Sequence, residues 1–590
     1  MIEKEKNKKK NGMLKKMLPA VRGYEKQTVG ASLMIVAEGV LEILIPFLMT
    51  KLINEGIDVE TPNMNIILSI GGLMLLMAFL ALGAGALCAR FAAVAGTGFA
   101  MNLRNMLFKK IQSFSFANVD RFSTASLITR LTTDVTNIQN LFTMLIRMTV
   151  RNFVIMITAF CFAIAVNAKL AIVFAVSIPV LGFVMLFIMI KAHPFFEKML
   201  TKMDLMNARV QENLIAIRVV KAFVKGEDET VSFNDAADTL RRAQVAAERI
   251  VIWNNPISQL IFYAAMVSVC YFGGSLIVGG DMLVGDLSGF LAYIGQILSS
   301  VMMLSMIFVS FIITRASQKR ITEVLDEQID VNDDDADPHL SVEDGSVEFN
   351  MVDFSYSKNP ENLTLENVSF RVRSGETVGI IGGTGSAKTT LVQLIPRLYD
   401  VLNGSIRVGG HDVREYKLDA LRDSVAMVLQ TNLLFSGTIE ENLRWGNENA
   451  TEEQIHAACR AAQAHDFIMS FPEGYKTNLG QGGVNVSGGQ KQRLCIARAL
   501  LKNPKVVILD DSTSACDTAT DAAIRHALRT ELRGTTTFII AQRIASVMDA
   551  DRVIVLDNGR VVAFDTPEKL LKTNDIYREV YESQMKGSEA

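Results

Sequence analysis

"TVGIIGGTGSAKTTLVQLI", residues Thr377–Ile395, decides the fold of the C-terminal half of the chain. A run rich in Val and Ile leads into a glycine-rich turn and then into the start of a helix, which is the order that a phosphate-binding loop needs. Backbone amides of such a loop cradle phosphates. We therefore expect Lys388 to reach the β- and γ-phosphates of a nucleotide and Thr389 to ligate Mg²⁺.

The loop departs from the usual pattern at one position. The pattern has glycine directly before the lysine, whereas this chain has Ala387. A methyl group there can crowd the path of the phosphates, so the sequence predicts binding without fixing its strength. A chance match is the alternative, and the order of strand, loop and helix argues against it. The candidate nucleotide-binding residues of the loop are Gly382, Gly383, Thr384, Gly385, Ser386, Ala387, Lys388, Thr389 and Thr390.

A second apolar run ends in two adjacent carboxylates, in "VVILDDSTSACD", residues Val506–Asp517. The run predicts a buried parallel strand, and Asp510 at its end is well placed to hold a hydrated Mg²⁺. The neighbouring Asp511 stands where a base could activate water. Whether its short side chain serves as one is the main question that the sequence raises.

Length and composition limit the classes of protein to which this chain can belong. With 590 residues and a net charge of −3, the chain is too long for one core and lacks the basic excess of a nucleic-acid binder. A hydrophobic fraction of 49% and a mean hydropathy of +0.26 favour a membrane portion. The six cysteines are scattered without metal-ligand spacing, and we interpret them as reduced core residues.

All the long apolar runs lie in the first half, and each is long enough to cross a bilayer. The loops 54–64 and 279–283 are short and lack Lys and Arg, whereas the loops 101–140 and 191–251 are long and carry many of both. This asymmetry predicts that the N-terminus and the long loops face the cytoplasm. The six expected spans are 28–53, 65–91, 141–166, 168–190, 253–279 and 284–313.

An acidic stretch punctuated by Pro and Gly, "DEQIDVNDDDADPHLSVEDGS", separates the two halves. Beyond it, apolar strands alternate with helical segments, which predicts a parallel α/β sheet flanked by helices. The predicted fold is a six-helix membrane domain followed by a soluble α/β nucleotide-binding domain. The expected parts are a cytoplasmic tail and elbow helix (1–27), a membrane domain with long cytoplasmic helical loops (28–320), a linker (321–344) and the nucleotide-binding domain (345–590).

The segment "NVSGGQKQR", residues Asn485–Arg493, resembles the signature sequence of ATP-binding cassette (ABC) proteins, and six spans followed by one cassette resemble an exporter half-transporter. The resemblance implies ATP and Mg²⁺ as ligands. It implies that Tyr356 stacks on adenine and that Gln430 ligates Mg²⁺ together with Thr389 and Asp510. The signature residues that it implies are Ser487, Gly488, Gly489 and Gln490.

Such cassettes work as head-to-tail pairs, in which the signature of one chain completes the ATP site of the other. The family normally has glutamate at Asp511, to activate the attacking water, and histidine at Gln542, to contact the γ-phosphate. Asp is one methylene shorter than Glu, and Gln, unlike His, cannot take up a proton. Gln481, just ahead of the signature, also replaces a frequent glutamate.

These departures, beside an intact signature, resemble the degenerate member of a heterodimeric exporter. Such a chain binds ATP but hydrolyses little of it, and a second half-transporter chain supplies the competent site. One alternative is a homodimeric transporter in which Asp511 is a working base. The other alternative is a membrane-bound regulatory subunit that ATP gates.

The expected cargo is amphipathic, a drug or a lipid, moved across the cell membrane by a multi-pass protein whose nucleotide-binding domain is cytoplasmic. Two charged pairs at helical spacing interrupt the spans: Glu38 with Glu42, and Arg147 with Arg151. Charges within a membrane are costly and face a partner or a watery cavity. The glutamates predict either a cavity that accepts cations or a structural role, as an ion pair between spans or by snorkelling toward the cytosol, and we favour the structural role.

Overall fold

The computed structural model describes residues 15–58, 62–334, 336–531 and 534–586, so the tail residues 1–14 lie outside the described part. The chain divides into two compact units. The first comprises residues up to Gln112 and Thr124–Glu327, and the second comprises Ser113–Ser123 together with the chain from Gln328 onward. The short segment Ser113–Ser123, which sequence analysis assigned to the membrane domain, thus belongs to the C-terminal unit by its contacts.

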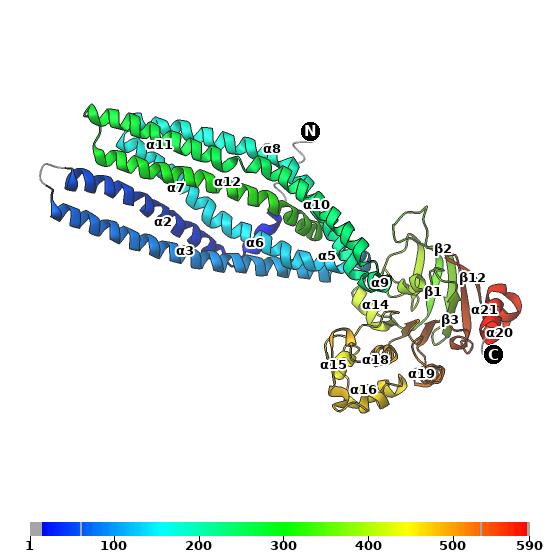
Figure 1. Cartoon of the computed structure of the whole chain (residues 1–590). Coiled ribbons are helices and arrows are strands. Elements are labelled where there is room, and N and C mark those ends of the chain that lie inside the picture. Colours follow the sequence, from blue (N-terminus) through cyan, green and yellow to red (C-terminus); the bar gives the residue numbers. More distant parts are fainter. Residues whose placement is uncertain (1–14, 59–61, 335, 532–533, 587–590) are drawn as a thin grey trace. The chain divides into compact units, whose positions relative to one another are not determined.

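The first unit is built from long helices (Figure 1). Among the described residues, six helical stretches are long and apolar enough to cross a membrane, which confirms the predicted number of spans. Their bounds are Glu25–Ile57, Met64–Gln112, Thr124–Val166, Ala168–Ile215, Gly226–Val278 and Val284–Asp326. Several of them continue far beyond the apolar runs, because the residues that follow, as in "RNMLFKKIQ" of α3 (Met64–Gln112), include the helix formers Arg, Met, Leu, Lys and Gln and contain no Gly or Pro.

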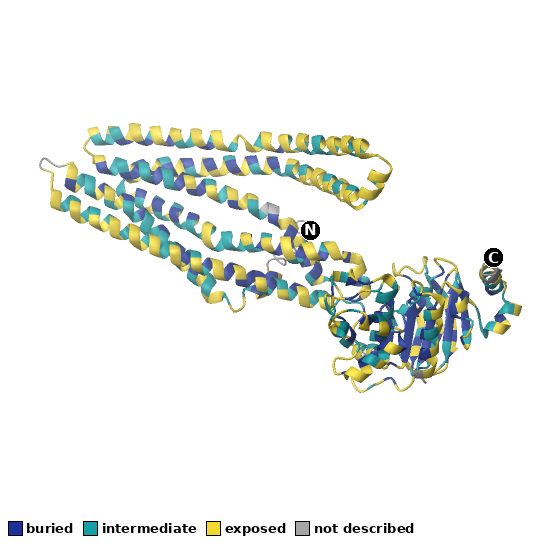
Figure 2. Ribbon diagram, turned by 60° about the horizontal axis from the view of Figure 1, so that its bottom comes forward, coloured by how far each residue is buried: buried dark blue, intermediate teal, exposed yellow. Residues whose placement is uncertain are grey.

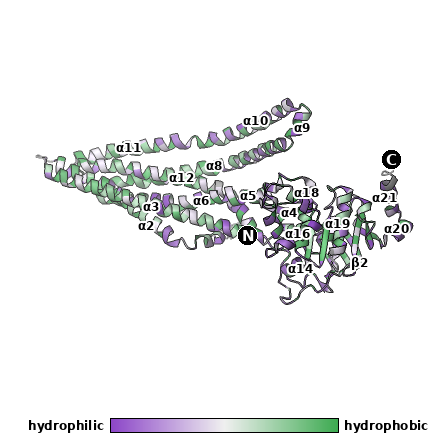
Figure 3. Ribbon diagram, turned by 90° about the horizontal axis from the view of Figure 1, so that it is seen from below, coloured by the Kyte–Doolittle hydropathy of each residue, from purple (hydrophilic) through white to green (hydrophobic). Residues whose placement is uncertain are grey.

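The apolar surface of these helices lies largely on the outside. Figure 3 shows the hydrophobic residues spread along the helices, and Figure 2 shows many helix positions exposed. On α3, Phe79 and Leu82 keep more than two thirds of their surface accessible, at 69% and 68%. A protein surface of this kind fits a lipid or another hydrophobic partner and not water. The finding supports a membrane domain, whose helices also share a buried core that includes Phe174, Phe290 and Tyr293.

The C-terminal unit contains two main sheets. A six-stranded sheet has the order β12-β11-β3-β10-β9-β6, in which only β12 runs antiparallel to its neighbour. Its strands are β3 (Thr377–Gly382), β6 (Val425–Val428), β9 (Val506–Asp510), β10 (Thr536–Ile540), β11 (Arg552–Asp557) and β12 (Arg560–Asp565). The antiparallel sheet has the order β2-β1-β4-β5. It comprises β1 (Val347–Phe354), β2 (Leu365–Val372), β4 (Asn403–Val408) and β5 (His411–Asp412).

Helices cover the parallel sheet, in which β9 and β10 are buried along their whole length (Figure 2). This arrangement confirms the predicted α/β domain. The main helices of the unit are α13 (Lys388–Gln393), α14 (Leu418–Ser424), α15 (Ile439–Arg444), α16 (Glu452–Ala461), α18 (Gly488–Leu501), α19 (Thr518–Glu531), α20 (Pro567–Thr573) and α21 (Asp575–Lys586). Helix α13 is short because Pro396 follows closely, and proline disfavours helical backbone at the residue before it.

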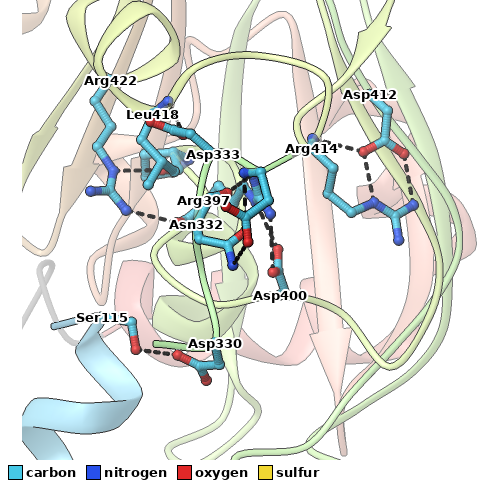
Figure 4. Close-up of polar contacts among 12 residues, drawn as sticks. Ser115, Asp330, Asn332, Asp333, Arg397, Asp400, Asp412, Arg414, Leu418 and Arg422 are labelled. Atoms are coloured by element: carbon cyan, nitrogen blue, oxygen red, sulfur yellow. Dashed lines mark hydrogen bonds and ion pairs between the residues drawn. The ribbon is translucent and has the colours of Figure 1, made fainter. Parts of the chain in front are cut away.

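The acidic stretch that follows Gln328 is held against this unit by specific contacts (Figure 4). Asp330 accepts a hydrogen bond from the Ser115 hydroxyl, and the Asn332 backbone carbonyl accepts one from Arg397 at 3.1 Å. Asp333 accepts from the backbone N–H of Leu418 at 2.8 Å, at the start of α14. These three bonds hold residues 330–333 in a defined conformation against the C-terminal unit.

Candidate functional site

Parallel strands bring the candidate residues to one edge of the six-stranded sheet. The phosphate-binding loop follows β3, Asp510 ends β9, Gln542 lies just beyond β10, and Gln430 lies just beyond β6. Ile540 at the end of β10 pairs with both Ile380 and Asp510, so β10 holds β3 and β9 in register. The carboxyl edge of such a sheet is the usual place for a ligand. A cavity of about 560 Å³ opens there.

The loop between β3 and α13 forms one wall of this cavity. Lys388 donates hydrogen bonds to the carbonyls of Gly382 at 3.0 Å and Gly383 at 2.8 Å, and it approaches the Ser386 hydroxyl at 3.4 Å. Burial lowers the pKa of Lys388, against the opposing effect of Asp510. Ser386 is buried behind the loop, and the loop residues that line the cavity are Gly382, Gly383, Thr384, Gly385, Ala387, Lys388, Thr389 and Thr390.

The structure explains why the pattern has glycine before the lysine. Ala387 adopts the left-handed conformation, with φ 72° and ψ 28°, at the N-cap of α13. Glycine takes this conformation without a steric penalty, whereas the Cβ of alanine crowds the backbone and makes the conformation unfavourable. The loop conformation is therefore retained in this chain at the expense of local backbone strain.

A carboxylate oxygen near the loop has a position suited to a cation. The Thr389 hydroxyl donates to Asp510 Oδ1 at 3.0 Å, whereas Asp510 Oδ2 is buried without a hydrogen-bond partner among the described residues. Burial raises the pKa of Asp510. Oxygen ligands of this kind, together with the Gln430 side chain on the same cavity, fit Mg²⁺. When bound, the ion supplies positive charge against the phosphates.

Asp511 and Gln542 are bonded to each other. Gln542 Nε2 donates to Asp511 Oδ2 at 2.8 Å, and both side chains line the cavity. Asp511 has a left-handed backbone, with φ 49°, and its N–H donates to the Ile540 carbonyl at 3.1 Å. Burial raises the pKa of Asp511, partly opposed by the bond from Gln542. In this arrangement one oxygen of the carboxylate is already used as an acceptor.

Tyr356 lies beside the loop and does not line the cavity itself. Its hydroxyl is 2.9 Å from the Thr390 hydroxyl, and its ring packs edge-on against Tyr399, with ring centroids 5.2 Å apart. Burial raises the pKa of Tyr356, which keeps the phenol neutral. With 48% of its surface exposed, the ring offers an aromatic face next to the phosphate-binding loop. Such a face suits stacking on a base.

Comparison with known proteins identifies this combination of domains. Residues 30–301 match the family model of the ABC transporter transmembrane region, and residues 365–514 match the ABC transporter model. The chain is 36% identical to an uncharacterized ABC transporter ATP-binding protein, YfiB of Bacillus subtilis, over 98% of this chain and 100% of the relative. The chain belongs to the ABC transporter family.

Two further relatives agree. The ABC transporter chain is 32% identical to an ATP-dependent lipid A-core flippase of Desulfotalea psychrophila, over 83% of this chain and 85% of the relative. It also superposes on the structure of a bacterial Atm1-family ABC exporter with ATP bound, with a TM-score of 0.84 and 26% identity, covering 95% of this chain and 99% of the other. The predicted fold of six membrane helices followed by an α/β cassette is thus confirmed. The protein is an ATPase-coupled transporter with a multi-pass membrane domain.

The signature residues of this ABC transporter lie apart from its own cavity. Ser487 caps α18, where its hydroxyl accepts from the N–H of Gln490 and its own N–H donates to Gln490 Oε1 at 2.9 Å. Neither residue lines the cavity beside Lys388. A Cβ on Gly489 would come within 2.8 Å of the Ala515 carbonyl oxygen, whereas one on Gly488 would meet nothing closer than 3.8 Å. A Cβ is therefore excluded at Gly489 by the Ala515 carbonyl, whereas Gly488 has room for one.

Sequence analysis missed several residues around the site, among them Gln584 and Tyr399. Gln584 of α21 lines the cavity, and Tyr399 connects Tyr356 to Asp120, whose carboxylate accepts from the Tyr399 hydroxyl at 2.7 Å. Neither residue stands in a glycine-rich or acidic pattern that marks a site. The apolar spacing of Tyr577 and Val580 along α21 would have predicted a packed helix, but not which loop its last turn contacts.

The membrane charges form ion pairs within the first unit. Arg151 Nη2 is 2.6 Å from Glu42 Oε2, and Arg151 Nε is 3.7 Å from Glu38 Oε1. The ion-pair interpretation of the glutamates is thus confirmed. Arg147, on the same helical face as Arg151, is exposed. One guanidinium joins the two glutamates of α2 (Glu25–Leu52) to the helix that begins at Val150.

Proposed function

We propose that this chain is one half of a heterodimeric ABC exporter, and that its own ATP site binds nucleotide but hydrolyses little of it. The observation that supports this proposal is the pairing of Asp511 with Gln542 at 2.8 Å. Asp511 is one methylene shorter than glutamate, and a displacement of about 1 Å can cost about a hundredfold in rate. An amide at position 542 accepts or donates a hydrogen bond, but unlike histidine it does not take up or release a proton near neutral pH.

In this proposal Lys388, the loop amides and Tyr356 hold ATP, while Thr389, Asp510 and Gln430 hold Mg²⁺. Asp511 orients water or the metal hydration shell and does not act as an effective base. Ser487, Gly488 and Gly489 complete a second site, whose base belongs to the partner half-transporter. Closure of the two cassettes on ATP drives the membrane helices toward an outward-open state, and hydrolysis at the partner's site resets them.

We propose amphipathic compounds, drugs or lipids, as cargo, and the cell membrane as the location, with the cassette in the cytoplasm. The name of the flippase relative supports a lipid-like cargo. The test of this part is ATPase activity in proteoliposomes. We expect amphipathic drugs or lipids to stimulate it and hydrophilic solutes to leave it unchanged. Stimulation by hydrophilic solutes alone would exclude the proposed cargo class.

The degenerate site is tested by one substitution in each of the two ATP sites. In the purified heterodimer, Asp511→Asn should keep more than half of the steady-state ATPase activity, because this residue stands in the slow site. Gly488→Asp should abolish nearly all of it, since the new carboxylate would face the γ-phosphate of the fast site. Gly488→Ala is the matched control, because a Cβ there has room, with its nearest neighbour at 3.8 Å.

The alternatives make different predictions. Removal of a positioned general base costs about 10² to 10⁴ in rate. A loss of that size in Asp511→Asn, together with brisk turnover by the chain purified alone, would establish the homodimeric transporter. Binding of ATP without transport by the complex would instead establish the regulatory subunit.

A further inference from the structure

The backbone that carries Gln542 is held by a side chain from the last turn of α21. Gln584 Nε2 donates to the Gln542 carbonyl at 2.9 Å, and Gln584 Oε1 accepts from the N–H of Ile544 at 2.7 Å. One amide group thus bonds two backbone groups of the loop that follows β10. This two-point contact resembles the pairing of one strand with the next, and it fixes the direction of the loop as well as its position.

Helix α21 is itself anchored without the help of Gln584. Tyr577 is almost fully buried, at 1% exposure, and Val580 and Tyr581 pack against the same hydrophobic core. Gln584 follows Tyr577 by seven residues, so both lie on the same face of the helix. The helix begins with a further bond, from the Tyr577 N–H to Asn574 Oδ1 at 2.9 Å. The position of Gln584 is therefore set by apolar packing that a substitution of its amide leaves intact.

The contact continues into the cavity. Gln542, fixed at its carbonyl by Gln584, donates through its side chain to Asp511, and all three residues line the same cavity as Lys388. Two hydrogen bonds from Gln584 hold the backbone of this loop in its observed conformation. A loop that is ordered in advance loses less conformational entropy when a ligand reaches it.

We propose that Gln584 is a positioning residue, which holds the loop of Gln542 in place to meet the terminal phosphate of the bound nucleotide. The inference concerns this chain's own cavity, and it holds whether the partner chain is identical or different. It predicts that loss of the Gln584 amide weakens binding of a nucleoside triphosphate more than binding of the diphosphate. A purely structural role of α21 would change both affinities to the same extent.

The test compares nucleotide affinities of the full-length chain in detergent or nanodiscs. Gln584→Met keeps the length and the helix propensity of the side chain and removes both hydrogen bonds. Ser583→Ala, an exposed neighbour on the same turn, is the matched control. The measurement is competition of a non-hydrolysable ATP analogue and of ADP against a fluorescent nucleotide. We expect the triphosphate-to-diphosphate affinity ratio to fall about fivefold in Gln584→Met, the size of one net hydrogen bond, and to stay unchanged in Ser583→Ala.

A double-substitution cycle completes the test. If Gln584 acts through Gln542, then Gln542→Ala should lower the ratio by a similar factor, and the double variant should lower it no further. Two results would overturn the proposal. One is a wild-type ratio in Gln584→Met. The other is a double variant whose loss equals the product of the two single losses, since independent effects multiply.

Discussion

Ala387→Gly tests how much the strained loop matters for nucleotide binding. The left-handed backbone of Ala387, with φ 72°, costs about 1–2 kcal/mol for a residue with a Cβ, and glycine removes that cost. Glycine also makes the unfolded chain more flexible, which costs about 0.4–1 kcal/mol. The methyl group packs, partly buried, against the core of the sheet, so its loss costs about half of the ~0.8 kcal/mol of a buried methylene.

These contributions largely cancel, and their midpoints leave a gain of about 0.4 kcal/mol, so we expect the free energy of unfolding to change by no more than about 1 kcal/mol. Nucleotide affinity should change by less than about threefold, because the loop already has its glycine-like conformation and the strain is the same with or without ligand. Ala387→Val is the informative contrast. A β-branched side chain does not tolerate the left-handed region, so the loop must shift, and we expect affinity to fall at least about tenfold.

The assay is fluorescence anisotropy of a labelled ATP analogue with the purified full-length chain, together with thermal unfolding of each variant. A tenfold or larger gain in affinity for Ala387→Gly would refute this reasoning. It would mean that the methyl group obstructs the phosphates directly, as the sequence alone suggested, and that the loop conformation is not the deciding factor.

Two further predictions concern charged groups. Burial raises the pKa of Asp510 above the ordinary aspartate value of 3.8, so Asp510 takes up a proton earlier as the pH falls, and Mg²⁺-dependent ATP binding should weaken at a higher pH than for a free aspartate. Titration of MgATP affinity from pH 7.5 to 4.5 checks this, and Asp510→Asn should remove that pH-dependent step while leaving weak metal-independent binding. Glu42→Gln loses the 2.6 Å ion pair with Arg151, so we expect about 1 kcal/mol less stability in a thermal unfolding assay and an equal loss of transport for cationic and neutral compounds. A loss confined to cations would instead assign Glu42 to the cargo path.

The features that could be predicted from sequence are those with a local cause. Glycine spacing and an apolar strand predicted the loop around Lys388, and an apolar run ending in a carboxylate predicted the position of Asp510. The six spans followed from the length of their apolar runs. Each of these signals is contained within a single short segment, so no knowledge of tertiary contacts was needed.

The features that escaped prediction depend on contacts between distant segments. Gln584 reaches the loop of Gln542 from a helix 42 residues further along the chain, and nothing in the sequence of α21 marks its last turn. The grouping of Ser113–Ser123 with the C-terminal unit is a second case. Its polar residues and aromatics are typical of any surface helix, so their partners follow only from the folded structure.

The C-terminal unit is built from two separate stretches of the chain, Ser113–Ser123 and the residues from Gln328 onward, and this has a consequence for its synthesis. Tyr399 bonds Asp120 across 279 residues of sequence, so the earlier segment leaves the ribosome long before its partner. At about 5–20 residues per second, the delay is roughly 15–60 s, during which the contacts of Ser113–Ser123 remain unmade. A cassette expressed from Gln328 onward never receives them: Asp330 lacks Ser115, and the Tyr399 hydroxyl next to the Tyr356 ring lacks its acceptor. Measurements on that fragment describe a nucleotide-binding domain without one of its own parts.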